Sequence, residues 1–97
     1  MINTIKAAEA LVEHGYRISR IADDRTVYFQ SETDEHVRGI IAVNGWYCVE
    51  RRSPSEYLLL ASISQANPNK EIQATMLEII KKTEVTTYGS SIEKGRR

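Results

Sequence analysis

Apolar residues recur every three or four positions over residues 4–14, TIKAAEALVEH, which is the pattern of an amphipathic helix. The apolar residues that share the predicted face are Ile5, Ala8, Leu11 and Val12. Asn3 or Thr4 can cap the start of this helix. Gly15 readily adopts the left-handed conformation that ends many helices. The sequence therefore predicts an N-terminal helix over residues 4–14.

After this helix come segments with the β-branched and aromatic residues that are typical of strands. The predicted strands are residues 16–21, 26–30, 36–43 and 46–52. Asp23-Asp24 and the polar residues 31–35 separate the first three. Asn44-Gly45 separates the last two and is favoured in a two-residue type I′ hairpin turn. Successive strands joined by short turns predict a four-stranded antiparallel meander.

The segment 53–56, SPSE, has the pattern of a helix start, with Ser at the cap, Pro next and Glu three residues after the cap. It predicts a buried helix over residues 57–65. The alternative is a fifth strand, because apolar residues also alternate there, at Tyr57, Leu59, Ala61 and Ile63. A second C-terminal helix is predicted to start at Asn67-Pro68 and to run to about Lys82. Its apolar face consists of Ile72, Met76, Ile79 and Ile80.

These elements predict the α+β fold class, with an N-terminal helix, a four-stranded antiparallel meander and two C-terminal helices. We expect one domain over residues 1–84. Residues 85–97 are polar and contain several Gly and Ser residues, so we expect a flexible tail.

Composition narrows the classes of function. The chain has 97 residues, with 13 basic and 13 acidic side chains, so its formal net charge is zero. Zero net charge argues against a strongly basic nucleic-acid clamp but leaves room for a local basic patch. The one cysteine cannot form an internal disulfide, which favours a reducing compartment. With no signal peptide and no apolar run of about 20 residues, we expect a cytoplasmic protein without a membrane partner.

The residues needed for catalysis or metal binding are sparse. The chain has two histidines, His14 and His36, and Cys48, with no short spacing between them. Cys48 lies within a predicted strand, far along from His36, and is expected to pack as a small apolar residue. No spacing of the glycines matches a nucleotide-binding loop. We therefore expect no metal, no cofactor and no enzymatic activity.

The Asn44-Gly45 hairpin raises the question of what covers its second face. A two-residue turn there pairs Val43 with Trp46 and makes both faces of the hairpin apolar. In one arrangement the helix over residues 4–14 covers one face and the C-terminal helices cover the other. In the alternative, one face stays partly open, with Trp46 or Tyr47 as an aromatic anchor for a partner.

The same turn places Arg38 directly opposite Arg51. Like charges across a strand pair repel each other unless an anion lies between them. A carboxylate of Glu50, Asp34 or Glu35 would supply that anion, and the alternative is a phosphate or an acidic partner surface. Arginines are concentrated in the strand region, at Arg17, Arg20, Arg25, Arg38, Arg51 and Arg52.

We expect a non-enzymatic binding or inhibitor protein that occupies a surface of a larger protein partner. One instance is a phage or mobile-element inhibitor of a host defence nuclease complex. The predicted partner-binding residues are Trp46, Tyr47, Arg38, Arg51 and Arg52. The alternative is an RNA- or DNA-binding module with stacking tyrosines and arginines on one sheet face. Its predicted residues are Arg17, Arg20, Tyr28, Arg38, Tyr47 and Arg51. Homo-oligomerisation stays open.

The segment His14-Gly15-Tyr16, followed by RISRI and then VYF, resembles the opening of HicA-type mRNA interferase toxins. The resemblance covers residues 2–43 and implies a helix followed by a short meander in a double-stranded-RNA-binding-like fold. That family carries its catalytic histidine on the second strand, where this chain has Arg25 and Thr26. A small toxin-like ribonuclease is therefore the weakest of the three functional hypotheses.

Overall fold

The computed structural model of the chain describes residues 1–64 and 69–83. In chain order the elements are α1 (Thr4–Glu13), β1 (Tyr16–Ile21), β2 (Val27–Ser31), β3 (Val37–Ala42), β4 (Gly45–Ser53), β5 (Glu56–Ser62) and α2 (Lys70–Thr83). The five strands form one antiparallel sheet in the order β1-β2-β3-β4-β5. The predicted α+β class is confirmed, and the sheet has one strand more than the favoured prediction.

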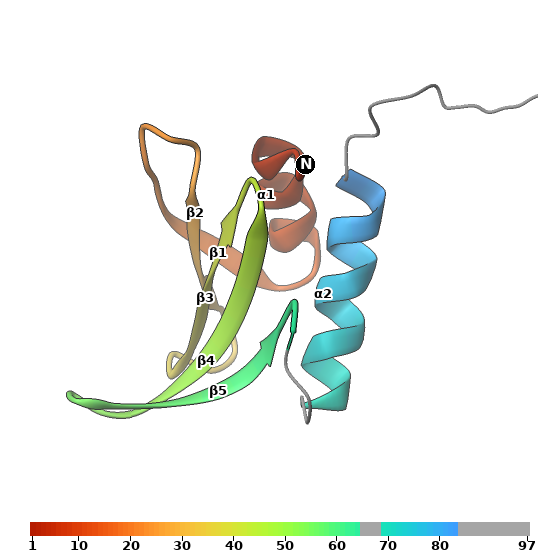
Figure 1. Cartoon of the computed structure of the whole chain (residues 1–97). Coiled ribbons are helices and arrows are strands. Elements are labelled where there is room, and N and C mark those ends of the chain that lie inside the picture. Colours follow the sequence, from red (N-terminus) through yellow and green to blue (C-terminus); the bar gives the residue numbers. More distant parts are fainter. Residues whose placement is uncertain (65–68, 84–97) are drawn as a thin grey trace, which may run out of the picture.

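Both helices lie on the same side of the sheet (Figure 1). α1 packs on β1, β2 and β3, and α2 packs on α1 and β5. The arrangement with helices on both faces is therefore wrong for the described part of the chain. No element within residues 1–64 and 69–83 covers the opposite face of the sheet, which answers the question raised by the hairpin.

The predicted helix over residues 57–65 is instead the strand β5, as the alternative proposed. Ser53 pairs with Glu56, so Pro54-Ser55 forms the turn between β4 and β5. The Ser53 hydroxyl accepts a hydrogen bond from the Ser55 backbone N–H at 3.4 Å. A serine side chain accepts a backbone N–H in a turn in the same way as it does at a helix cap. A sequence typical of a helix cap therefore forms a hairpin turn here.

The described C-terminal region therefore has one helix, α2, where two helices were predicted. Its predicted start at Asn67-Pro68 lies outside the described residues. Asn69 caps α2, because its side-chain oxygen accepts the Ile72 N–H at 3.1 Å. The predicted apolar face is confirmed, with three buried residues and one partly buried residue: Met76, Ile79, Ile80 and Ile72.

The two strands of the β3–β4 hairpin were predicted correctly, but the pairing of their residues was not. Ala42 pairs with Gly45, so Val43-Asn44 forms the turn, and neither Asn44 nor Gly45 has a positive φ. The Val43 carbonyl accepts a hydrogen bond from the N–H of the buried Ile2 at 2.8 Å. Pairing with the chain that precedes α1 thus takes Val43 out of the hairpin ladder.

This change of register separates the predicted arginine pair. Arg38 lies opposite Val49 and not opposite Arg51. Because the pairing moved by two residues, each side chain keeps its predicted face. Arg38 and Arg51 therefore share a face as diagonal neighbours.

α1 begins and ends as predicted. The Asn3 side chain accepts a hydrogen bond from the Lys6 N–H at 3.1 Å, and Gly15 has a φ of +90°. The buried face differs from the prediction, because Ile5 and Val12 are exposed. The buried residues of α1 are Thr4, Ala7, Ala8 and Leu11. The small side chains of Ala7 and Ala8 let the helix approach the sheet closely.

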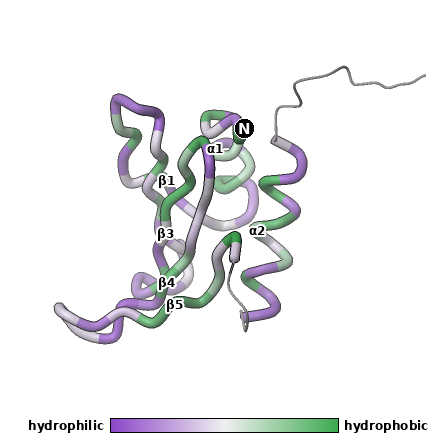
Figure 2. The backbone as a smooth tube through the Cα atoms, viewed as in Figure 1, coloured by the Kyte–Doolittle hydropathy of each residue, from purple (hydrophilic) through white to green (hydrophobic). Residues whose placement is uncertain are grey.

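The core lies between the helices and one face of the sheet. Across the sheet, paired core positions form two rows, Ile18-Phe29-Gly39-Cys48-Ala61 and Val27-Ile41-Trp46. The Tyr16 and Phe29 rings meet edge to face, with centroids 5.3 Å apart. Figure 2 shows hydrophobic positions along β5 and one side of α2, and hydrophilic β1–β2 and β4–β5 turns.

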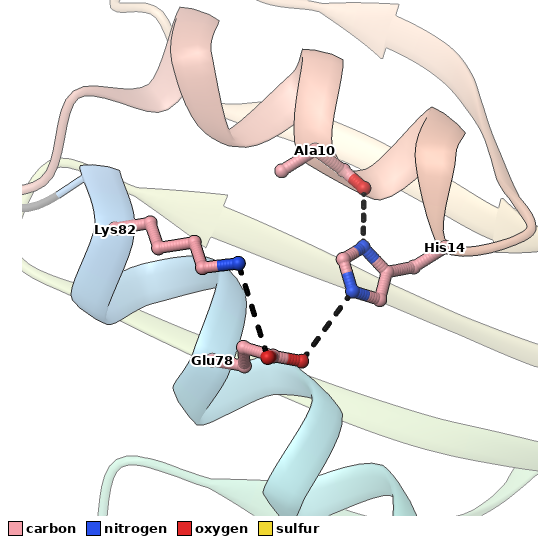
Figure 3. A network of polar contacts seen from close by, with 4 residues as sticks. All are labelled: Ala10, His14, Glu78 and Lys82. Carbon is pink, nitrogen blue, oxygen red and sulfur yellow. Dashed lines mark hydrogen bonds and ion pairs between the residues drawn. The ribbon is translucent and has the colours of Figure 1, made fainter.

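A polar network joins the two helices at the edge of this core (Figure 3). His14 Nδ1 lies 2.8 Å from the Ala10 carbonyl oxygen, and His14 Nε2 lies 3.5 Å from Glu78 Oε1. Lys82 Nζ lies 3.9 Å from Glu78 Oε2. A carbonyl oxygen can only accept, so Nδ1 carries a proton in this arrangement. His14 thus has a structural position between helices.

Candidate nucleic-acid interface

The side of the sheet that faces away from the helices is called the open face here. Its paired positions form two rows across the sheet. One row is Arg17, Gln30, Arg38, Val49 and Leu59, and the other is Arg20, Tyr28, Ile40, Tyr47 and Ser62. By alternation, Arg51 and its β5 partner Tyr57 lie on the same side. The open face thus combines aromatic, apolar and arginine side chains.

The charged side chains that the described strands direct to the open face are all arginines: Arg17, Arg20, Arg38 and Arg51. The acidic residues of these strands, Glu50 and Glu56, alternate onto the other face. A face with four positive charges therefore exists in a chain whose formal net charge is zero.

An arginine already stacks on a tyrosine at this face. The Arg20 guanidinium carbon lies 4.9 Å from the centroid of the Tyr28 ring. The bulge between Ile18 and Arg20 brings Arg20 opposite Tyr28. This contact holds the Tyr28 ring at the face and leaves a planar cation beside it.

A hollow of about 510 Å³ lies along the middle of the open face. The side chains around it include three tyrosines, Tyr28, Tyr47 and Tyr57, together with Gln30, Arg38, Ile40 and Val49. Tyr47 is 41% exposed and Tyr57 is 53% exposed. Exposed tyrosines beside apolar side chains give planar surfaces for stacking, and Arg38 adds a positive charge at the edge.

The structure brings together all six residues of the nucleic-acid hypothesis. Arg17, Arg20, Tyr28, Arg38, Tyr47 and Arg51 share the open face. Of the residues of the protein-partner hypothesis, only some lie on the open face. Trp46 is only 4% exposed and packs in the core, and Arg52 Nε lies 3.4 Å from Glu50 Oε1 near the β4–β5 turn.

The sequence prediction missed Tyr57 and Leu59 as residues of this site. It assigned them to a helix, on whose surface they would not have joined the sheet. Their signal was the alternation of apolar residues that supported the fifth-strand alternative. Gln30, Ile40 and Val49 were missed as well, because their position in the hollow depends on pairing across β2, β3 and β4.

The structure locates the residues that were considered for catalysis and metal binding. Cys48 is fully buried, and burial raises the pKa of its thiol to about 11, so the nucleophilic thiolate is disfavoured at neutral pH. β2 (Val27–Ser31) contains no histidine, so the catalytic residue implied by the toxin resemblance has no counterpart there. Within residues 1–64 and 69–83, no three His, Cys, Asp or Glu side chains come together as a metal site requires. No described helix is long and apolar enough to cross a membrane.

The burial of Cys48 predicts a loss of stability at high pH. An unfolded thiol with a pKa near 9.0 loses its proton before the folded one, whose pKa is about 11. The unfolded state then binds fewer protons, so the free energy of unfolding falls between pH 9 and 11, by up to about 1.4 kcal/mol per pH unit. We expect Cys48→Ala to flatten this slope, as measured by urea unfolding at several pH values.

The slope of Cys48→Ala is compared with that of the unaltered protein. Burial also raises the pKa of Tyr16, but this phenol is present in both proteins and contributes equally to the two slopes. Only the difference between the two slopes reports on Cys48. Equal slopes in the two proteins would contradict the prediction.

Comparison with known proteins found no protein family that matches the chain, no matching curated protein and no matching solved structure. The geometry of the open face is therefore the basis on which a function is proposed.

Proposed function

We propose that this protein is a non-enzymatic binding protein that holds a single-stranded nucleic acid, RNA or DNA, on the open face of its sheet. The observation that carries the proposal is the shared position of Arg17, Arg20, Tyr28, Arg38, Tyr47 and Arg51 on one face. Arginines supply contacts to phosphates, and tyrosines supply stacking surfaces for bases.

A single strand suits this face better than a duplex. Bases in a duplex are stacked on one another, whereas the bases of a single strand are free to stack on tyrosine rings. Tyr28 and Tyr47 lie on either side of β3, so their strands are about 10 Å apart. At that spacing the two rings can contact different bases of one strand.

The charge of the face also suits the backbone of a nucleic acid. Four arginines surround the tyrosines, and the acidic strand residues Glu50 and Glu56 lie on the other side. The local field, and not the net charge of the chain, determines where a polyanion binds. Zero net charge is therefore compatible with binding at this face.

The test is a titration of a fluorescently labelled single strand of about 12 nucleotides, followed by anisotropy at several salt concentrations. With four arginines in contact with phosphates, the slope of log affinity against log salt should approach roughly −3. A duplex of the same sequence is the control and should bind more weakly. Absence of binding at low salt, or a slope near zero, would overturn the proposal.

Exposed apolar residues on β5 favour a second candidate function, in which the partner is a protein. Tyr57 is 53% exposed, and Leu58 and Leu59 are each 40% exposed. β5 is an edge strand of the sheet, and an exposed apolar edge is a common place for a partner to add a strand. An inhibitor of a host defence nuclease, encoded by a phage or mobile element, is one instance of this second candidate.

The two candidates differ in what a captured complex contains. A protein partner should stay bound to the tagged chain after nuclease treatment of a lysate, and Leu58→Lys should release it. A nucleic acid should be lost on nuclease treatment and be retained by Leu58→Lys, because Leu58 pairs with Glu50 on the side away from the open face.

A further inference from the structure

A second hollow, of about 440 Å³, lies where β3 begins, next to the tyrosine-lined hollow. Three arginines, Arg38, Arg51 and Arg52, and His36 lie around it, and the β4–β5 turn borders it at Ser53 and Pro54. Arg38 lines both hollows. The two hollows are therefore neighbouring parts of one surface.

Two of the three arginines at this hollow, Arg38 and Arg51, are oriented by neutral groups. Arg38 Nη2 donates to the Glu35 carbonyl at 3.0 Å, and Arg51 Nε donates to the Ser53 carbonyl at 3.3 Å. A carbonyl fixes the direction of a guanidinium but leaves its positive charge uncompensated. Among the described residues, no carboxylate oxygen lies within 4.0 Å of either guanidinium.

The carboxylates expected to neutralise these arginines are engaged elsewhere or stand apart. Glu50 lies 3.4 Å from Arg52 Nε, and Asp34 Oδ1 accepts the N–H of His36 at 3.0 Å. Glu35 borders the hollow but makes no ion pair with Arg38. In addition, the buried Nε of Arg38 has no hydrogen-bond acceptor among the described residues. The positive charge of Arg38 is therefore not neutralised by any described carboxylate.

We infer that this hollow binds the terminal phosphate of a nucleic-acid strand that lies on the open face. Arg38 and Arg51 are diagonal neighbours with free guanidinium donors, so one phosphate can accept hydrogen bonds from both. A terminal phosphomonoester offers up to two negative charges, against one for a phosphodiester, and so matches two uncompensated arginines. The inference rests on the proposed function, because Arg38 would join the phosphate to the base-stacking tyrosines.

The experiment compares three single strands of one sequence, labelled internally, with a 5′-phosphate, a 3′-phosphate or hydroxyls at both ends. We expect one of the phosphorylated strands to bind about tenfold more tightly than the hydroxyl-ended strand. Arg51→Gln should abolish this difference. The matched control Arg25→Gln should keep it, because Arg25 lies in the β1–β2 turn and lines neither hollow.

Equal affinity of the three strands would overturn the terminal-phosphate site while leaving the proposed function intact. Absence of binding by all three strands would overturn both proposals. A tenfold difference that persists in Arg51→Gln would also overturn the site, because the phosphate would then be recognised elsewhere.

Discussion

Replacing Gly39 by alanine is expected to lower the free energy of unfolding by about 3 kcal/mol, the upper end of the range for an overpacked core. A Cβ at Gly39 would lie 2.5 Å from Cζ of Phe29 and would also overlap the backbone carbonyl oxygen of Tyr47. The Phe29 ring is fully buried, and the Tyr47 carbonyl belongs to a strand in the middle of the sheet. Neither group can move without disturbing the core or the ladder.

Urea unfolding of the two proteins measures this effect. Gly45→Ala is the matched control, because a Cβ there meets no atom within 4 Å and the residue has no positive φ. We expect the control to change stability by less than about 0.5 kcal/mol. Similar losses in both variants would show that the Phe29 ring does not depend on the missing side chain at position 39.

Local signals in the sequence were sufficient for the two helices that form, α1 and α2, although they also predicted a helix where β5 lies. Asn3 caps the start of α1, and Gly15 follows its end. The apolar stripe from Ile72 to Ile80 marks the buried face of α2. Capping and period depend on residues within a few positions of one another, so they can be read without the fold. Which face of α1 is buried could not be read in this way, because it depends on how closely the helix approaches the sheet.

Elements that depend on distant partners were predicted less well. Pro54 and Glu56 satisfy the local pattern of a helix start, yet β5 pairs with β4 along most of its length. The Val43 carbonyl accepts a hydrogen bond from the N–H of Ile2, which is more than 40 residues away in sequence. Each of these results shows tertiary pairing overriding a correct local preference.

The composition of the open face could not be read from alternation alone. Arg17 and Arg20 are three residues apart, so a regular strand would direct them to opposite faces. The bulge between Ile18 and Arg20 restores Arg20 to the side of Tyr28. A bulge depends on the partner strand, so the sequence could suggest these arginines but not place them on one face.

The second large effect is expected for the double variant Arg38→Ala, Arg51→Ala. Each arginine that contacts a phosphate of a single strand contributes about −0.7 to the slope of log affinity against log salt. Removing two should bring the slope closer to zero by about 1.4 and weaken binding at low salt at least tenfold. Anisotropy titrations of the labelled single strand measure both quantities.

The matched control is Lys81→Ala, Lys82→Ala, which removes the same charge from the exposed side of α2. If attraction to the whole molecule determined the affinity, both double variants would weaken binding equally, because each lowers the net charge by two. If the open face is the binding site, only the arginine variant changes the slope, because counterion release depends on phosphates that are actually contacted. Equal losses in the two variants would therefore contradict binding at the open face, even if the unaltered protein binds nucleic acid tightly.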